Sequence, residues 1–176
     1  MLFRSANPGK LNYATAGAGS ATHLSVAYLA GVAGIDVVHI PLKGTNEAIN
    51  EVLAGRSHLV ISSTIGALGF TKDARIRMLG VTGATRSKFI PDLPTLEEGG
   101  VKGYKFDSWI GLLGPAGIPK PALDQLNGAM AKILQTPSAL EKLDKQGVVP
   151  KALTPEAFMG LVRENYTAMG AVVKTA

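Results

Sequence analysis

The sequence contains no cysteine, few aromatic residues and no long hydrophobic run. Without cysteine, disulfides, thiol nucleophiles and thiolate metal sites are excluded. Aromatic residues make up only 6% of the 176 residues. No uninterrupted apolar run reaches the roughly 18 residues of a membrane span, so we expect none. The opening residues, MLFRSANPGK, also lack the apolar stretch that is typical of a signal peptide.

Charge of one sign is not concentrated anywhere along the chain. The sequence has 18 basic and 13 acidic residues, for a net charge of +5. Nucleic-acid-binding proteins usually cluster their basic residues and interleave them with aromatic ones. Here the basic residues are scattered, so they indicate an ordinary solvated surface and no nucleic-acid partner. The hydrophobic share of 46% is sufficient for a packed core.

Strand-like and helix-like segments alternate along the first 107 residues. We expect strands at residues 11–15, 36–40, 59–63 and 76–81, with helices at 20–33, from 45 to about 55, and at 67–71. Gly34 is expected to end the first helix and Thr45 to cap the second. Such an alternation predicts an α/β fold with a parallel sheet and right-handed crossovers.

The remainder of the chain has a different pattern. A connector rich in proline and glycine leads to an expected long strand at 104–114, followed by three amphipathic helices between residues 121 and 173. Thr136 and Thr154 each precede a proline, which is typical of a capped helix start. We therefore divide the chain into an α/β unit, 9–107, and a strand with helices, 108–176, whose apolar faces need a partner.

Residues 14–24, ATAGAGSATHL, place two glycines and small hydroxylated residues at a strand-to-helix junction. Backbone N–H groups at a helix start can bind an anion such as a carboxylate, although a tight turn explains the glycines equally well. A dinucleotide fingerprint would need glycine at Thr22 and an acidic residue near Lys43. An NADP site, in which Lys43 meets a 2′-phosphate, therefore stays open only as a weak alternative.

The histidines do not indicate a catalytic or metal site. His23, His39 and His58 show no metal-ligand spacing, and no Gly-x-Ser-x-Gly motif supports a catalytic triad. No acid–base pair can be assembled, so we predict no catalytic residue, no metal and no cofactor. Trp109, at the change in composition, fits either the wall of a ligand cleft or simple hinge packing.

Five segments, in order, resemble one known family. They are NPGKLNYATAGAGSATHL, VVHIPLKGTNEAINEVLAGR, IRMLGVTGATRS, PDLPTLEEGG and SWIGLLGPAGIPKPALDQLNGAMAKIL. Their order and spacing resemble the Bug receptors, the substrate-binding proteins of tripartite tricarboxylate transporters. The resemblance implies a type II periplasmic-binding-protein-like lobe plus a helical remnant of the other lobe. It also implies a periplasmic location, small di- or tricarboxylate ligands and membrane permease subunits as partners.

The resemblance also suggests where a ligand would bind. The predicted ligand-binding residues are Gly17, Ala18, Gly19, Ser20, Ala21, Thr22, Lys43, Ser63, Asp107 and Trp109. Family members are nearly twice as long, which suggests a chain truncated at its N-terminus. They usually carry an aromatic residue where Leu42 stands and an aspartate where His58 stands.

Three functions remain in competition at this point. The first is a carboxylate receptor or its truncated form, the second an NADP-dependent enzyme on a Rossmann-like lobe, and the third a non-binding interaction protein. The apolar helix faces further predict a homodimer, because exposing them to water would be costly. The expected interface includes Leu126, Met130, Phe158, Leu161 and Val162.

Overall fold

The computed structural model describes residues 9–174 of the chain. They form two compact units. The first unit runs to Ser108 and also includes the residues from Gly170 onward, and the second unit comprises Trp109–Met169. No helix among residues 9–174 is both long enough and apolar enough to cross a membrane.

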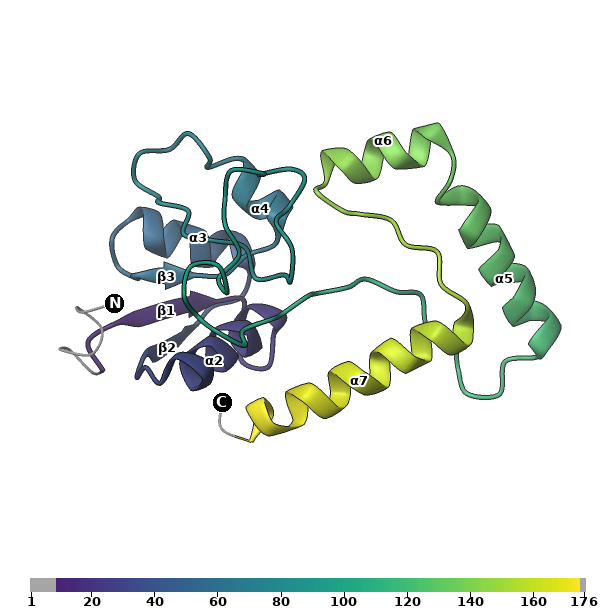
Figure 1. The fold of residues 1–176 in the computed structure, drawn as a ribbon, viewed down its shortest axis with the longest axis horizontal. Helices are drawn as coiled ribbons and strands as arrows, with labels where there is room; N and C mark the ends of the chain where they lie inside the picture. The colour runs from purple at the N-terminus through teal and green to yellow at the C-terminus, as the bar shows by residue number, and fades with distance from the viewer. Residues whose placement is uncertain (1–8, 175–176) are drawn as a thin grey trace. The chain divides into compact units, whose positions relative to one another are not determined.

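A three-stranded parallel sheet forms the centre of the first unit (Figure 1). Strand β1 (Asn12–Thr15) lies between β2 (Val38–Pro41) and β3 (Leu59–Val60). Thr15 pairs with Pro41 and Ala14 with Val60, so all three strands end at the same edge of the sheet. This parallel sheet confirms the predicted α/β class, although β3 is shorter than expected.

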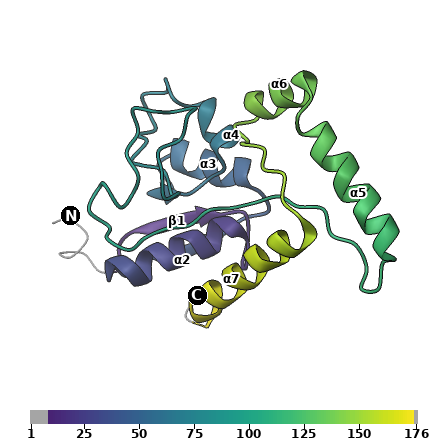
Figure 2. The same ribbon diagram turned by 45° about the vertical axis from the view of Figure 1, so that its right-hand side comes forward.

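Helices α2 (Ala21–Ala33) and α3 (Thr45–Leu53) lie on opposite sides of this sheet (Figures 1 and 2). Helix α2 begins and ends as predicted: the Ser20 side chain caps its start, and Gly34 ends it in the left-handed conformation, with φ 59°. The predicted Thr45 cap is wrong. Gly44 occupies the cap position of α3, and the Glu47 carboxylate accepts the preceding N–H, of Lys43, at 3.0 Å.

The core of the first unit is small and includes Tyr104, which lies at the end of the connector. Ala14, Val26 and Ala48 are fully buried, and Tyr104 is 1% exposed. The Tyr104 hydroxyl donates to the Ser25 carbonyl of α2 at 3.0 Å, and burial raises the pKa of this phenol. Tyr104 therefore anchors the connector to α2 with both its ring and its hydroxyl.

The expected strand at 76–81 is absent, and this prediction is wrong. The short helix lies earlier than predicted, at α4 (Thr64–Leu68). Val81 pairs with the connector instead of with β3: its N–H bonds to the Pro94 carbonyl and its carbonyl accepts from Leu96, both at 2.9 Å. The result is one isolated parallel bridge, between Val81 and Thr95, which does not extend the sheet.

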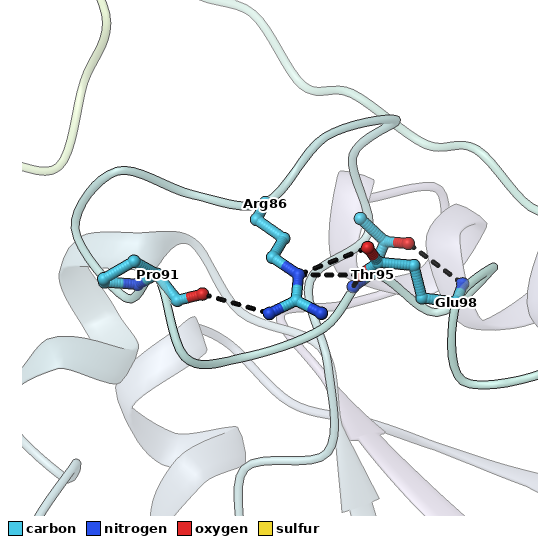
Figure 3. Close-up of polar contacts among 4 residues, drawn as sticks. All are labelled: Arg86, Pro91, Thr95 and Glu98. Atoms are coloured by element: carbon cyan, nitrogen blue, oxygen red, sulfur yellow. Dashed lines mark hydrogen bonds and ion pairs between the residues drawn. The ribbon is translucent and has the colours of Figure 1, made fainter.

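An arginine and a reciprocal cap hold the connector in shape (Figure 3). The Glu98 carboxylate accepts the Thr95 N–H at 2.8 Å, and the Thr95 hydroxyl accepts the Glu98 N–H at 3.0 Å. Arg86 forms an ion pair with Glu98 at 3.0 Å and donates to the Pro91 carbonyl at 3.4 Å. These contacts explain the PDLPTLEEGG segment as a structural turn.

The second unit contains helices but no strand among the described residues. Its elements are α5 (Lys120–Ile133), α6 (Pro137–Lys145) and the larger part of α7 (Pro155–Val173). The threonine caps are confirmed, since Thr136 accepts from Ala139 at 3.3 Å and Thr154 accepts from Ala157 at 3.2 Å. The long strand predicted at 104–114 is wrong, because no neighbouring strand pairs with it.

Burial in the second unit is slight. No residue in the described range 109–169 is buried, and Ile110 is 94% exposed. Trp109 is 39% exposed, and its ring meets Phe158 edge-on at 5.0 Å between centroids. Gly111 lies directly under the Phe158 ring, where any Cβ would collide with it. Phe158, expected at a dimer interface, therefore packs within its own unit.

Candidate functional site

The order of the strands identifies the edge of the sheet where a ligand is expected. From β1 the chain passes to β2 on one side and then to β3 on the other. In open parallel sheets, ligands bind beyond the carboxyl ends of the strands where the winding direction switches. The glycine loop, residues 16–20, follows β1 at this point, while Lys43 follows β2 and Ser63 follows β3.

The two loop glycines are required by the backbone. Gly17 has φ 117° and Gly19 has φ 74°, conformations that side chains rarely adopt. A Cβ on Gly17 would also lie 3.2 Å from the Leu42 carbonyl oxygen, and the Leu42 N–H bonds to Thr15 at 3.0 Å. The loop after β1 is thus in close contact with the segment that leads to Lys43.

Several loop N–H groups are already used inside the loop. Those with a partner are Ala16, bonded to Thr22 Oγ1 at 2.9 Å, Gly17, bonded to Thr15 Oγ1 at 3.2 Å, Gly19, bonded to His23 Nδ1 at 3.1 Å, and Ser20, bonded to Gly17 O at 3.2 Å. These four N–H groups are therefore not available to an anion, and only the other N–H groups of the loop and first helical turn can bind one.

Three N–H groups of the loop and first helical turn remain without a partner among the described residues: those of Ala18, Ala21 and Thr22. Ala18 and Ala21 are exposed. The unpaired first-turn N–H groups of a helix point outward from its N-terminal end, where the helix dipole also favours negative charge. The hydroxyls of Ser20 and Thr22 lie 2.8 Å apart at the same place. This arrangement can bind a carboxylate.

A cavity of about 360 Å³ opens beside the loop. It is lined by Gly19 and His23 at the loop and by the apolar side chains of Leu24 and Val173. A ligand with a carboxylate at the helix N-terminus could place a short aliphatic chain against these apolar groups. The cavity therefore adds space for more than an inorganic anion.

Two histidines lie beneath the loop, and sequence reasoning missed this pair. His23 of α2 and His39 of β2 stack with ring centroids 4.0 Å apart, and the Tyr13 ring continues the stack on His39 at 5.0 Å. His39 Nε2 lies 2.7 Å from the Thr15 hydroxyl. Burial, with a smaller effect of neighbouring His23, lowers the pKa of His39. Only the register that pairs Tyr13 with His39 would have revealed the stack.

Among the described residues, no hydrogen bond or ion pair joins the side chains of the other predicted site residues to the loop. Lys43 is exposed beyond β2, and Ser63 is exposed at the cap position of α4. Asp107 lies against Gly83, where an added Cβ would come within 2.7 Å of its Oδ1. Trp109 belongs to the second unit and packs on Phe158. Among residues 9–174, no cluster of His, Asp or Glu could hold a metal ion.

The model of the tripartite tricarboxylate transporter family receptor matches residues 2–176, almost the whole chain. The chain belongs to this receptor family. Its members are non-enzymatic solute-binding receptors, so the alternative of an NADP-dependent enzyme is wrong. The resemblance inferred from the five sequence segments is confirmed.

The match covers different shares of two curated relatives. A Pseudomonas sp. protein encoded in the tcbD–tcbE intergenic region is 33% identical over 89% of this chain, but the match covers only 47% of that relative. A Pseudomonas knackmussii protein from the clcB–clcD intergenic region is 32% identical over 85% of this chain and 89% of its own length. The chain thus spans about half the length of the first relative and nearly all of the second.

Solved receptors of the family share the fold. An R. palustris protein solved with adipate superposes with a TM-score of 0.87 at 29% identity, covering 99% of this chain and 58% of that one. MatC from Rhodopseudomonas palustris, solved with bound malate, gives a TM-score of 0.84 at 26% identity, over 98% of this chain and 60% of its own. A third structure is that of the periplasmic binding protein BugD, with a TM-score of 0.81 at 30% identity.

Proposed function

We propose that this chain binds a small organic dicarboxylate through the N-terminus of α2. The observation that carries the proposal is a set of three backbone N–H groups beside the cavity, of Ala18, Ala21 and Thr22, that have no partner among residues 9–174. Family membership and the adipate and malate of the solved relatives support the choice of ligand class. In this proposal one carboxylate is held by N–H groups, and the aliphatic part lies against Leu24 and Val173.

The remaining predicted residues have secondary roles in the same proposal. Lys43, exposed beyond β2, supplies a screened positive charge, and Lys43→Met should weaken binding only about two- to fivefold at low salt. Ser63 offers a hydroxyl beyond β3. Asp107 and Trp109 stay proposed ligand-binding residues on the strength of the family resemblance alone.

The proposal extends to the transport system. Of the relatives with the same fold, one is described as a periplasmic binding protein and another as a periplasmic transporter. By analogy, the chain delivers its ligand in the periplasm to the permease subunits of a tripartite tricarboxylate transporter. Its second unit is proposed to be the helical part of the other, incomplete lobe of the full-length receptors.

Replacing Ala21 with proline tests the proposed binding mode directly. Ala21 is the first residue of α2, a position where proline is well tolerated because its missing N–H has no helical partner. Ser20 has φ −69° and ψ 160°, an extended conformation compatible with a following proline. Ala21→Pro therefore removes one donor while leaving the helix in place.

Calorimetric titration with adipate and with malate measures the effect. A hydrogen bond to a charged group contributes about 1.5–3 kcal/mol, so Ala21→Pro should weaken binding by about tenfold or more. The matched control, Ala21→Ser, keeps the N–H and should bind as the parent does. Equal affinity of the proline variant would refute the binding mode, and no binding by the parent would favour a non-binding interaction protein.

We further propose that a second copy of the chain covers the apolar helix faces of the second unit. Leu126 is 49% and Met130 37% exposed on α5, while Leu161 and Val162 of α7 are partly exposed. Light scattering at micromolar concentration should give a mass well above 18.3 kDa, and a monodisperse mass near that value contradicts the dimer. Leu126→Glu should dissociate it, whereas Phe158→Glu would also disturb the packing on Trp109.

A further inference from the structure

The two glycines of the loop are each held by one of the two stacked histidines. His23 Nδ1 accepts the Gly19 N–H at 3.1 Å. His39 Nε2 lies 2.7 Å from Thr15 Oγ1, which in turn accepts the Gly17 N–H at 3.2 Å. The loop that carries the unpartnered N–H groups is thus tied to a pair of titratable rings, one directly and one through a hydroxyl.

We propose that His23 is a positioning residue of the carboxylate site, which keeps the glycine loop in its binding conformation only while its imidazole is neutral. This inference rests on the proposed function. His23 is 7% exposed, and its backbone N–H also bonds to Ser20 Oγ at 3.2 Å. One residue therefore connects the loop to α2 through both its side chain and its main chain.

The chemistry of imidazole makes this contact dependent on protonation. Neutral histidine has one donor and one acceptor nitrogen, whereas the imidazolium ion has two donors and no acceptor. Protonated His23 cannot accept the Gly19 N–H at Nδ1, so the two N–H groups would oppose each other. The loop must then move, and Ala18, which lies between the two glycines, moves with it.

The His23 ring lies among aromatic rings and apolar side chains. The groups facing the His23 ring are His39 of β2, stacked at 4.0 Å, Tyr13 of β1, stacked at 6.3 Å, and the apolar Leu24 and Val173 along the cavity. No carboxylate contacts either ring among the described residues. Of the two rings, His39 has a lowered pKa, because of burial first and of neighbouring His23 second.

Three variants separate a positioning role from a purely structural one. His23→Leu keeps the bulk of the side chain but removes the acceptor. His23→Asn places a non-titrating oxygen near the position of Nδ1. His58→Gln changes the exposed histidine that contacts Asn12 on the opposite end of β1, and it serves as the matched control.

Malate and adipate affinities are measured from about pH 7.5 to pH 5.5. The parent and His58→Gln should lose at least about fivefold more affinity across this range than His23→Asn, whose profile should follow only the titration of the ligand. Titration of the ligand's own carboxyl groups is common to all variants and cancels in this comparison. At pH 7.5, His23→Leu should bind at least about fivefold more weakly than His23→Asn, consistent with one lost hydrogen bond. Parallel pH profiles of the parent and His23→Asn, or equal affinities of His23→Leu and the parent, would overturn the proposal.

A second measurement does not depend on any ligand. In the unliganded parent, the Gly19 amide resonance should shift with pH along the same titration curve as the His23 ring protons. A Gly19 resonance that stays fixed while His23 titrates overturns the inference even if His23→Leu fails to fold. If neither dicarboxylate binds the parent at any pH, the proposed function fails, while this titration still decides whether His23 controls the loop.

Discussion

The two units of this receptor use apolar residues in different ways. In the first unit, the sheet and its two covering helices bury Ala14, Val26 and Ala48 completely. In the second unit, α5, α6 and α7 are equally regular helices, but no described residue between 109 and 169 is buried. In this protein, regular helices therefore form even where no core is buried.

The difference shows which parts of a fold depend on neighbours. A threonine cap and a proline at the first helical position act within one turn, and both are in place at α6 despite its exposed surroundings. Burial requires a second layer, which the first unit has and the second unit lacks. We expect substitutions of buried residues to be costly in the first unit, and substitutions at exposed positions outside the proposed interface to be nearly silent in the second.

Matched tyrosine substitutions should give the largest contrast. Tyr104 is 1% exposed and donates a hydrogen bond to Ser25, whereas Tyr166 of α7 is 83% exposed. Replacing a large buried aromatic side chain with alanine costs about 3–5 kcal/mol, so Tyr104→Ala should lower the free energy of unfolding by that amount. Urea unfolding followed by circular dichroism measures the effect.

Tyr166→Ala is the control and should change the unfolding free energy by less than about 0.5 kcal/mol. Fluorescence of the single tryptophan, Trp109, follows the second unit separately. A loss of more than about 2 kcal/mol in Tyr166→Ala would show that another surface covers α7, in agreement with the proposed dimer.

Two glycine substitutions within the first unit should change stability by an intermediate amount and in opposite directions. Gly17 has φ 117° and faces the Leu42 carbonyl, so Gly17→Ala should destabilise the protein by about 1–3 kcal/mol. Gly31 lies inside α2 with open space around it, so Gly31→Ala should stabilise the protein by about 0.5–1 kcal/mol. Thermal unfolding compares the two. Equal effects would show that loop geometry contributes nothing beyond ordinary glycine entropy.

Local signals in the sequence predicted the local features of the fold. Ser20 and Gly34 correctly predicted both ends of α2, and Thr136 predicted the start of α6. The strands at 76–81 and 104–114 were predicted wrongly, because strand-like composition does not provide a neighbouring strand. Val81, for example, pairs with the connector at Thr95.

For the candidate site, as for the fold, the sequence predicted the local motif but not the contacts between distant residues. The glycine loop was visible as a local motif at a strand-to-helix junction. Which N–H groups stay unpartnered was not predictable, because it depends on contacts such as that between Gly19 and His23. The stack of His23 on His39 joins α2 to β2, so it follows from the register of the sheet and not from any sequence spacing.

The smallest expected contrast concerns two exposed glutamates. Glu98 accepts the Thr95 N–H at 2.8 Å and pairs with Arg86, and these contacts, the backbone bond first, lower the pKa of Glu98 (Figure 3). A carboxylate with a lowered pKa stabilises the fold above its unfolded pKa of 4.5, and this contribution is lost as the pH falls through the lower folded value. Glu98→Gln keeps an acceptor but not the charge, so it should lower Tm by about 1 °C at neutral pH and by less near pH 3.

Glu141 on α6 pairs only with Lys145 at the surface, so Glu141→Gln should leave Tm unchanged at both pH values. If both variants lost the same Tm at neutral pH, the turn held by Glu98 would be no more important to the first unit than a surface ion pair is to the second.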